Sequence, residues 1–220
     1  MRPFLYLFGG FVVVGAWLQV AFNKYALLLF VNGHYTSFLD SVMPWWTDFG
    51  LGGTHVFLIF LLFGYAWFRR DRFTAVRWGW LSLLSFALPS LLSQLLKHTI
   101  FDNVLRPSND MVGGTLHFVP GVEMYGYNSF PSGHTITAFS IALTLVYLFV
   151  QPAARRGAVA TWAWSPLLFL WACSVGYSRM YLGEHFFADV YGGAIIGVLA
   201  TGFALWLGER TLPYKPRASR

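Results

Sequence analysis

The chain has 220 residues, of which 56% are hydrophobic, 20% aromatic and only 11% charged. Soluble proteins carry about 25% charged residues, so this composition excludes an ordinary soluble enzyme and indicates an integral membrane protein. The net charge of +6 comes from basic residues that are spread over short loops and the tail, which argues against a nucleic-acid partner. We expect one helical membrane domain over residues 1–220 and no second, soluble domain.

Apolar runs recur along the chain, and several approach the roughly 20 residues that a helix needs to cross a bilayer. The N-terminal run is long and lacks a clear small-x-small cleavage site, so it predicts an uncleaved first span rather than a secretory signal. We therefore predict an all-α protein in which six transmembrane helices form one bundle, at about residues 4–22, 52–68, 78–96, 134–150, 162–178 and 187–207.

Residues 25–52, between the first two predicted spans, are apolar but broken by polar side chains. Two arrangements fit this pattern. The segment either extends the first span or forms an interfacial helix with Trp45 and Trp46 at the depth of the lipid headgroups.

Eleven of the fifteen Lys and Arg residues fall on one side of the six-span arrangement. Because positively charged loops stay inside the cell, this bias predicts a multi-pass protein of the cytoplasmic (inner) membrane with both termini in the cytoplasm. The eleven residues are Arg2, Arg69, Arg70, Arg72, Arg77, Arg155, Arg156, Arg210, Lys215, Arg217 and Arg220.

The opposite, periplasmic or outer, side carries all six histidines and most of the carboxylates. A chain with so few charges that gathers its titratable groups at one face is predicted to do its chemistry there. These groups are His34, His55, His98, His117, His134, His185, Asp40, Asp48, Asp102, Asp110, Glu123, Glu184 and Asp189.

The first constellation on this side lies at the end of the third span. Lys97 closes the span, and Arg106 follows in the loop, next to Pro107. Arg offers a planar fork of donors and Lys a compact point charge, so together they can hold an anion. The alternative is that both side chains only extend toward the headgroups.

The second constellation is Pro131-Ser132-Gly133-His134, in an otherwise apolar stretch. Pro131 fits the first turn of a helix, and Ser132 and Gly133 leave free backbone N–H groups there, which bind anions well. His134 then sits where it can exchange a proton with a bound anion. The alternative is a capped helix start with an exposed histidine.

The third constellation lies between the fifth and sixth spans, within residues 176–193. Arg179 closes the fifth span, and His185 and Asp189 stand four residues apart. On a helix they share a face, so the carboxylate can bind one imidazole nitrogen and leave the other free to attack. A purely structural His–Asp pair is the alternative.

Together the three stretches supply three cations, a backbone anion cradle and two imidazoles at the outer ends of spans three to six. These parts predict a phosphate site. No metal or other cofactor is expected, because the histidines lack a carboxylate or thiolate partner set for zinc and the cations would repel it.

The same residues resemble the signatures of the type 2 phosphatidic acid phosphatase (PAP2) family. Ser178-Arg179, five residues, His185, three residues and Asp189 resemble the third signature, and residues 131–134 match the second. Arg106-Pro107, preceded by Lys97, resembles the first. With 43 residues between the second and third motifs, the resemblance covers most of residues 78–207, the expected phosphatase core.

One spacing departs from the family pattern. Eight residues rather than the usual six separate Lys97 from Arg106. Either Lys97 or a neighbour such as His98 therefore supplies this cation.

The resemblance implies a metal-independent hydrolase of lipid phosphates or diphosphates that forms a phosphohistidine. It implies that His185 is the nucleophile, that Asp189 orients it, and that His134 is first general acid and then general base. The phosphoryl group would be bound by Lys97, Arg106, Ser132, Gly133 and Arg179.

Within the family, the expected substrates are phosphatidylglycerol phosphate, phosphatidic acid, lipid A phosphates and undecaprenyl diphosphate. Of these we prefer undecaprenyl diphosphate, by analogy with the family. The loop from Ser108 to Phe130 joins two phosphate-binding motifs, so we expect it to choose the headgroup. Alternatives are a lipid phosphotransferase with the same site, an anion transporter, and a relative of the soluble vanadate-dependent haloperoxidases, against which the composition argues. The oligomeric state stays open.

Overall fold

The computed structural model describes residues 1–110, 115–150 and 158–212. These residues form helices joined by turns and one long connection, and they contain no strand, which confirms the all-α prediction. The helices are α1 (Arg2–Ala21), α2 (Lys24–Gly33), α3 (Ser37–Asp48), α4 (Gly52–Phe68), α5 (Arg72–Leu95), η1 (Leu96–Ile100), α6 (Gly133–Leu145), η2 (Val146–Val150), α8 (Ala158–Tyr181) and α9 (Phe187–Arg210).

Polar residues mark the start of several helices, as their capping chemistry requires. The Asn23 side chain accepts a hydrogen bond from the Ala26 N–H at the start of α2, and Thr36 does the same for the Leu39 N–H at the start of α3. Asp71 accepts from the Thr74 N–H and begins α5 directly after the α4–α5 turn. These caps explain why apolar runs break into separate helices at these points.

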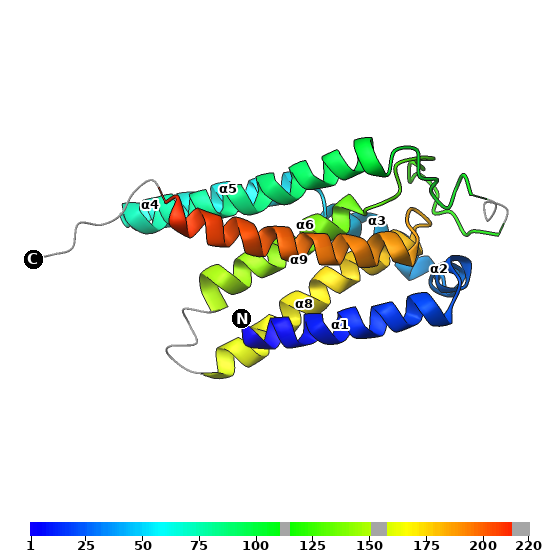
Figure 1. Cartoon of the computed structure of the whole chain (residues 1–220), viewed down its shortest axis with the longest axis horizontal. Coiled ribbons are helices and arrows are strands. Elements are labelled where there is room, and N and C mark those ends of the chain that lie inside the picture. The colour runs from blue at the N-terminus through cyan, green and yellow to red at the C-terminus, as the bar shows by residue number, and fades with distance from the viewer. Residues whose placement is uncertain (111–114, 151–157, 213–220) are drawn as a thin grey trace, which may run out of the picture.

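Helix α6 lies at the centre of the bundle, packed against α5, α8 and α9, while α4 packs on α5 and α1 on α8 (Figure 1). Its core residues Ala138, Phe139 and Ala142 are almost completely buried. A Cβ at Gly197 of α9 would lie 2.9 Å from the Ile136 carbonyl oxygen, so glycine permits the close approach of the two backbones. Small residues allow such contacts between membrane helices.

A buried chain of hydroxyl groups also joins the three central helices. Ser140 of α6 donates to the Ser85 carbonyl of α5, Thr144 donates to the Ser85 hydroxyl at 2.9 Å, and Thr201 of α9 donates to the Ser140 hydroxyl at 2.8 Å. In an apolar interior each of these hydroxyls needs a partner. The network therefore holds the helices that carry the candidate site in one register.

Four helical stretches in the described parts of the chain are long and apolar enough to cross a membrane: Arg2–Ala21, Arg72–Ile100, Gly133–Val150 and Phe187–Arg210. Helices α3 and α4 pass the same test together but are bent by 58° at their junction, which gives up to five candidate spans. The prediction of several apolar helices is confirmed, and the count of six stays a prediction.

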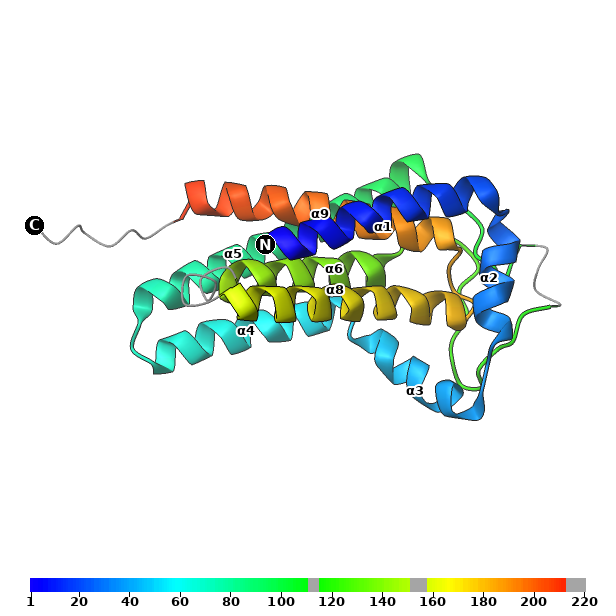
Figure 2. The same cartoon turned by 90° about the horizontal axis from the view of Figure 1, so that it is seen from below.

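The segment between the first two predicted spans does not extend the first span. Helix α1 ends at Ala21, and α2 then crosses the end of the bundle before the chain turns into α3 (Figure 2). Trp45 is 78% exposed, whereas the Trp46 indole N–H donates to the Ser174 hydroxyl at 2.9 Å. Trp46 therefore fastens α3 to α8, and only Trp45 has the exposure expected at a headgroup layer.

The two ends of the bundle differ in charge. Toward one end lie the start of α1, the α4–α5 turn and the end of α9, which carry Arg2, Arg69, Arg70, Arg72 and Arg210 (Figure 1). At the other end lie the α8–α9 turn and the described residues of the long connection, 101–110 and 115–132. This separation agrees with the predicted grouping of loops, while the assignment of the basic end to the cytoplasm stays a prediction. Arg155, Arg156, Lys215, Arg217 and Arg220 fall outside the described residues.

Candidate active site

The three predicted motifs meet at the end of the bundle that lacks the basic turns. Within the connection between α5 and α6, the Arg106 N–H donates to the Gly126 carbonyl at 2.9 Å, and the Ser129 N–H donates to the Val104 carbonyl at 3.0 Å. The Ser132 N–H donates to the Asp189 carbonyl at 3.1 Å and so joins the start of α6 to α9. These backbone contacts bring the first, second and third motifs together.

Arg106 and Arg179 are both almost completely buried, at 9% and 6% exposure. Nε of Arg106 donates to the Tyr127 carbonyl at 2.9 Å, and its guanidinium lies 5.4 Å from the centre of the Tyr125 ring. Buried cations require partners. The two arginines share one, the buried carboxylate of Glu184.

One nitrogen of the Arg179 guanidinium has no partner in the described parts of the chain. Its Nη1 donates to the Thr47 hydroxyl at 2.9 Å and its Nη2 lies 3.3 Å from Glu184 Oε2, but its buried Nε has no hydrogen-bond partner among the described residues. A buried donor without an acceptor costs about 1–3 kcal/mol. An anion bound at this end of the bundle would satisfy it, as the sequence motif predicts.

His185 and Asp189 form the expected pair, but not from one helical face. His185 lies in the turn before α9, which follows Gly183 in its left-handed conformation (φ +71°), and Asp189 lies in the first turn of α9. His185 Nδ1 is 3.4 Å from Asp189 Oδ2, and the same oxygen accepts from the Phe186 N–H at 2.9 Å. Asp189 thus caps α9 and faces the imidazole at once.

The Ser129 hydroxyl is a third partner of this pair. It donates to Asp189 Oδ2 at 2.5 Å and lies 3.5 Å from His185 Nδ1. With Nδ1 directed at the carboxylate, Nε2 of His185 carries the lone pair that can attack an electrophile. Catalytic hydrogen bonds are often long before substrate binds, so 3.4 Å is compatible with this role.

The His185 imidazole is buried and surrounded by positive charge. Burial, together with the charges of Arg106, Arg179 and Lys97, lowers the pKa of His185 well below its usual range. The ring is therefore neutral at physiological pH. A neutral imidazole is the form that can act as a nucleophile.

His134 is the second residue of α6 and lies half-buried beside the same charged groups. It lines a cavity of about 270 Å³ between α4, α5 and α6, together with Gly133 and Gly50. A Cβ at Gly50 would lie 2.8 Å from both the Cβ and the carbonyl oxygen of His134, so the turn before α4 packs directly against it. His134 therefore lies both within reach of the cations' charges and in the wall of an open cavity.

The unusual spacing in the first motif begins at a π-helical turn. The Phe101 N–H donates to the Leu96 carbonyl at 2.8 Å, so η1 holds one residue more than an α-helical turn. Lys97, in this turn, is half-buried and near enough to Arg106, Arg179 and Asp189 for their charges to act on it, whereas His98 is exposed. The structure therefore favours Lys97 over His98 as the third cation.

The backbone cradle at the start of α6 is smaller than expected. Ser132 is the N-cap, Pro131 precedes it, and the helix begins at Gly133. The prediction that the Ser132 N–H is free is wrong, because Asp189 accepts it; its hydroxyl accepts from Thr135 at 3.0 Å and the residue is fully buried. A Cβ at Gly133 would meet nothing within 4 Å, so the space beside the first residue of α6 is open.

Three residues of the candidate site were given no role in it from the sequence: Glu184, which was named only among the outer-side carboxylates, Ser129 and Thr47. Glu184 carried a signal, since it is a carboxylate that directly precedes His185, and Ser129 lies next to the second motif. Thr47 carried none, because the hydrogen bond to Arg179 joins positions that are 132 residues apart.

The loop expected to choose the headgroup is largely fastened to α2 and α3. Asp110 pairs with Lys24, and His117 Nε2 lies 2.9 Å from Asp40 while its ring stacks on Tyr35 at 3.8 Å. These contacts give Asp110 and His117 structural roles. Among the described residues of this loop, Tyr125 is 53% exposed and its ring lies against the Arg106 guanidinium, so it is placed to meet a headgroup.

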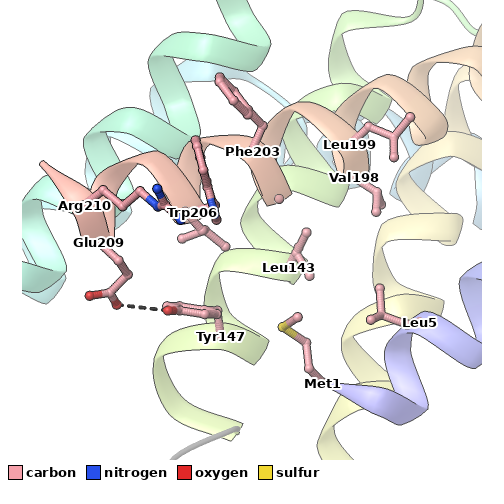
Figure 3. Close-up of a pocket in the computed structure, with 12 residues that line it drawn as sticks. Met1, Leu5, Leu143, Tyr147, Val198, Leu199, Phe203, Trp206, Glu209 and Arg210 are labelled. Atoms are coloured by element: carbon pink, nitrogen blue, oxygen red, sulfur yellow. Dashed lines mark hydrogen bonds between the residues drawn. The ribbon is translucent and has the colours of Figure 1, made fainter.

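A second cavity, of about 610 Å³, lies at the basic end between α1, α6 and α9 (Figure 3). Its lining is mostly apolar, with the Tyr147 hydroxyl donating to Glu209 at 2.9 Å and Arg210 lying 4.3 Å from the Trp206 ring centre at its rim. Neither histidine of the motifs lines it. The chemistry predicted from the sequence therefore belongs to the opposite end.

Residues 78–212 match the family profile of the PAP2 superfamily. The chain belongs to this superfamily. The match covers the three motifs and confirms the resemblance seen in the sequence. It extends over α5, α6, α8 and α9, the helices that carry the site.

Curated relatives agree with this assignment. Phosphatidylglycerophosphatase B of Bacillus subtilis (strain 168) is 32% identical over 163 residues, which are 73% of this chain and 71% of that protein. The bacitracin transport permease protein BcrC of Bacillus licheniformis is 42% identical over 83 residues, but these are only 38% of this chain and 35% of that protein. A lipid A 4'-phosphatase of Bacteroides thetaiotaomicron is 36% identical over 105 residues, 47% of this chain and 40% of that protein.

Solved structures show the same fold. The crystal structure of a transmembrane PAP2-type phosphatidylglycerolphosphate phosphatase from Bacillus subtilis covers 98% of this chain and all of its own, with 25% identity and a TM-score of 0.63. The crystal structure of Aquifex aeolicus LpxE has 24% identity and a TM-score of 0.58, covering 83% of this chain and 94% of its own. The protein is thus a multi-pass membrane protein of the PAP2 fold.

Proposed function

We propose that this protein is a membrane lipid phosphatase that hydrolyses a lipid phosphate or diphosphate through a phosphohistidine. The observation that carries the proposal is the meeting of a neutral His185, held by Asp189, with two buried arginines, one of which has an unpaired donor. Relatives named as phosphatidylglycerophosphatase and lipid A phosphatase support the lipid phosphate as substrate.

In the first step, His185 Nε2 attacks phosphorus, and the bond between phosphorus and the lipid oxygen breaks. Arg106, Arg179, Lys97 and the Gly133 N–H stabilise the charge on the phosphoryl oxygens, and Ser132 fixes the turn that presents Gly133. Asp189 stabilises the positive charge that develops on His185. Proton balance requires an acid at the departing oxygen, and this acid is His134.

The cavity beside His134 supports its role, because the departing lipid oxygen needs space next to the acid. The bound phosphoryl dianion favours the protonated form of His134. In the second step, His134 accepts a proton from water, the water oxygen bonds to phosphorus, and the bond from phosphorus to His185 breaks. Phosphate leaves and both histidines return to their starting states.

No step in this mechanism requires a metal ion, so hydrolysis should persist in a chelator. Vanadate should inhibit, because it mimics five-coordinate phosphorus. The test is phosphate release by purified protein in detergent from undecaprenyl diphosphate, phosphatidylglycerol phosphate, phosphatidic acid and lipid A, with and without chelator. Loss of activity in chelator that zinc or magnesium restores would contradict the metal-free mechanism.

The same assay separates hydrolysis from transfer. A hydrolase releases phosphate without an acceptor lipid, whereas a phosphotransferase requires one. An anion transporter has less support, because its charged residues are expected near the middle of the membrane, and the motif residues here lie at helix ends. Undecaprenyl diphosphate remains our preferred substrate on the family resemblance alone.

We further propose that the site faces the periplasm and that both termini lie in the cytoplasm. The basic residues of the opposite end support this orientation. A reporter fused after Arg220 should be cytoplasmic, and a cysteine at exposed Thr115 should react with an impermeant reagent added outside. Labelling of that cysteine only in opened cells would reverse the orientation.

A further inference from the structure

Glu184 is a buried carboxylate for which the proposed mechanism has no use. It is 1% exposed and directly precedes His185. A single oxygen, Oε2, pairs with Nη1 of Arg106 and lies 3.3 Å from Nη2 of Arg179. Two guanidinium groups from separate segments thus converge on one acceptor.

Besides Glu184, each arginine side chain makes one hydrogen bond to the described residues. Arg106 is held by the Tyr127 carbonyl in the long connection, and Arg179 by the Thr47 hydroxyl at the end of α3. One hydrogen bond does not define the plane of a guanidinium group, whereas a second contact does. The shared carboxylate supplies that second contact to both groups and so fixes where their remaining N–H groups point.

The carboxylate also sets the charge of the site. The cations Lys97, Arg106 and Arg179 lie among the carboxylates of Glu184, Asp189 and Asp48, whose charges act on them. Removing the charge of Glu184 therefore makes the site more positive by one charge. A site with more uncompensated positive charge binds a phosphate dianion more tightly, whether that anion is substrate or product.

We propose that Glu184 is a positioning residue of the phosphate site, whose carboxylate aims Arg106 and Arg179 at the phosphoryl group and whose charge limits how tightly the product phosphate binds. This rests on the proposed function, in which inorganic phosphate is the last product to leave. Because Glu184 touches the arginines and not the reacting atoms, it acts through them. Its removal should therefore change turnover and phosphate affinity in opposite directions.

The test uses Glu184→Gln, which keeps the shape and one acceptor oxygen but removes the charge. We expect kcat to fall by about tenfold or more, because misplaced arginines stabilise the transition state less well. The inhibition constant of inorganic phosphate should fall by about three- to tenfold, because the site becomes more positive. Glu184→Asp, which restores the charge on a shorter side chain, should return phosphate affinity toward the wild-type value.

Glu209→Gln is the matched control. Glu209 pairs with Arg77 at the opposite end of the bundle in the same kind of Arg–Glu contact, so its removal tests for a general effect of breaking an ion pair. We expect kcat and the phosphate inhibition constant of this variant to stay at wild-type values. A similar change in both variants would overturn the proposal.

Binding is also followed without turnover, as the rise in unfolding temperature that inorganic phosphate or vanadate produces. If the wild-type protein binds phosphate but hydrolyses no lipid phosphate, the proposed function fails, while the role of Glu184 in anion binding is still measured. Weaker phosphate binding by Glu184→Gln, or unchanged kcat and binding, would overturn the proposal. If Glu184→Gln does not fold, Glu184→Asp decides: wild-type kcat despite the shortened side chain would contradict a positioning role.

Discussion

Replacing Arg179 with lysine keeps the positive charge and removes the planar fork. In the wild-type protein Nη1 donates to Thr47 and Nη2 lies near Glu184, while the buried Nε has no partner in the described parts of the chain, so three separate nitrogens serve three positions. A lysine has one nitrogen and cannot reach all three positions. The substitution should therefore lose the donor that meets the phosphoryl group together with one internal anchor.

The expected loss follows from these contacts. A hydrogen bond to a charged group contributes about 1.5–3 kcal/mol, so loss of the donor to the phosphoryl group alone lowers kcat/KM by about 10- to 150-fold, since 1.36 kcal/mol is a factor of ten. Loss of the internal anchor misplaces the remaining charge and adds to this effect.

The assay is phosphate release by Arg179→Lys in detergent, with thermal unfolding to show that the variant is folded. Arg77→Lys is the matched control, because Arg77 pairs with Glu209 away from the site and should keep its activity. A folded Arg179→Lys variant with more than about a tenth of wild-type kcat/KM would refute the argument from the fork.

Three further predictions concern the histidines and Lys97. His134→Ala should reduce turnover most for a lipid phosphate, whose alcohol is a poor leaving group, and least for an aryl phosphate, whereas His185→Ala should reduce turnover of both equally. If His134→Ala loses activity equally on both substrates, and phosphoenzyme is still trapped by rapid quench in His185→Ala, the assigned roles are wrong. Lys97→Ala should reduce phosphate release by about 10- to 100-fold and His98→Ala should leave it unchanged, because of the two only Lys97 lies among the charges of the site. A large loss in His98→Ala with little loss in Lys97→Ala would show that His98 supplies the third cation. The pKa of His185 is lowered in the folded protein, so at low pH the unfolded chain takes up a proton that the folded chain does not, and stability should fall as pH drops below about 6.5. Between pH 7 and pH 5, the unfolding temperature of His185→Gln should therefore fall less than that of the wild type. An equal fall would contradict the lowered pKa.

The residues of the site were largely recognisable from sequence because each motif is short. Arg179, His185 and Asp189 stand within eleven positions, and residues 131–134 are contiguous, so local geometry alone brings each group together. Apolar runs likewise determine helices in a membrane, since a buried backbone must satisfy its own hydrogen bonds. The all-helical bundle and the grouping of residues within each motif were therefore predictable, while the phosphate chemistry of the site stays a prediction.

Contacts between the motifs depended on packing that no local pattern encodes. The Ser132 N–H was expected to be free, yet the Asp189 carbonyl, more than fifty positions away, accepts it once α6 and α9 pack together. The choice of Lys97 over His98 depended on burial, because in the folded chain Lys97 is half-buried near the charges of the site and His98 is exposed. The Thr47 contact to Arg179 and the shared carboxylate of Glu184 likewise required the fold, because burial decides which charges must pair and only the tertiary structure decides what is buried.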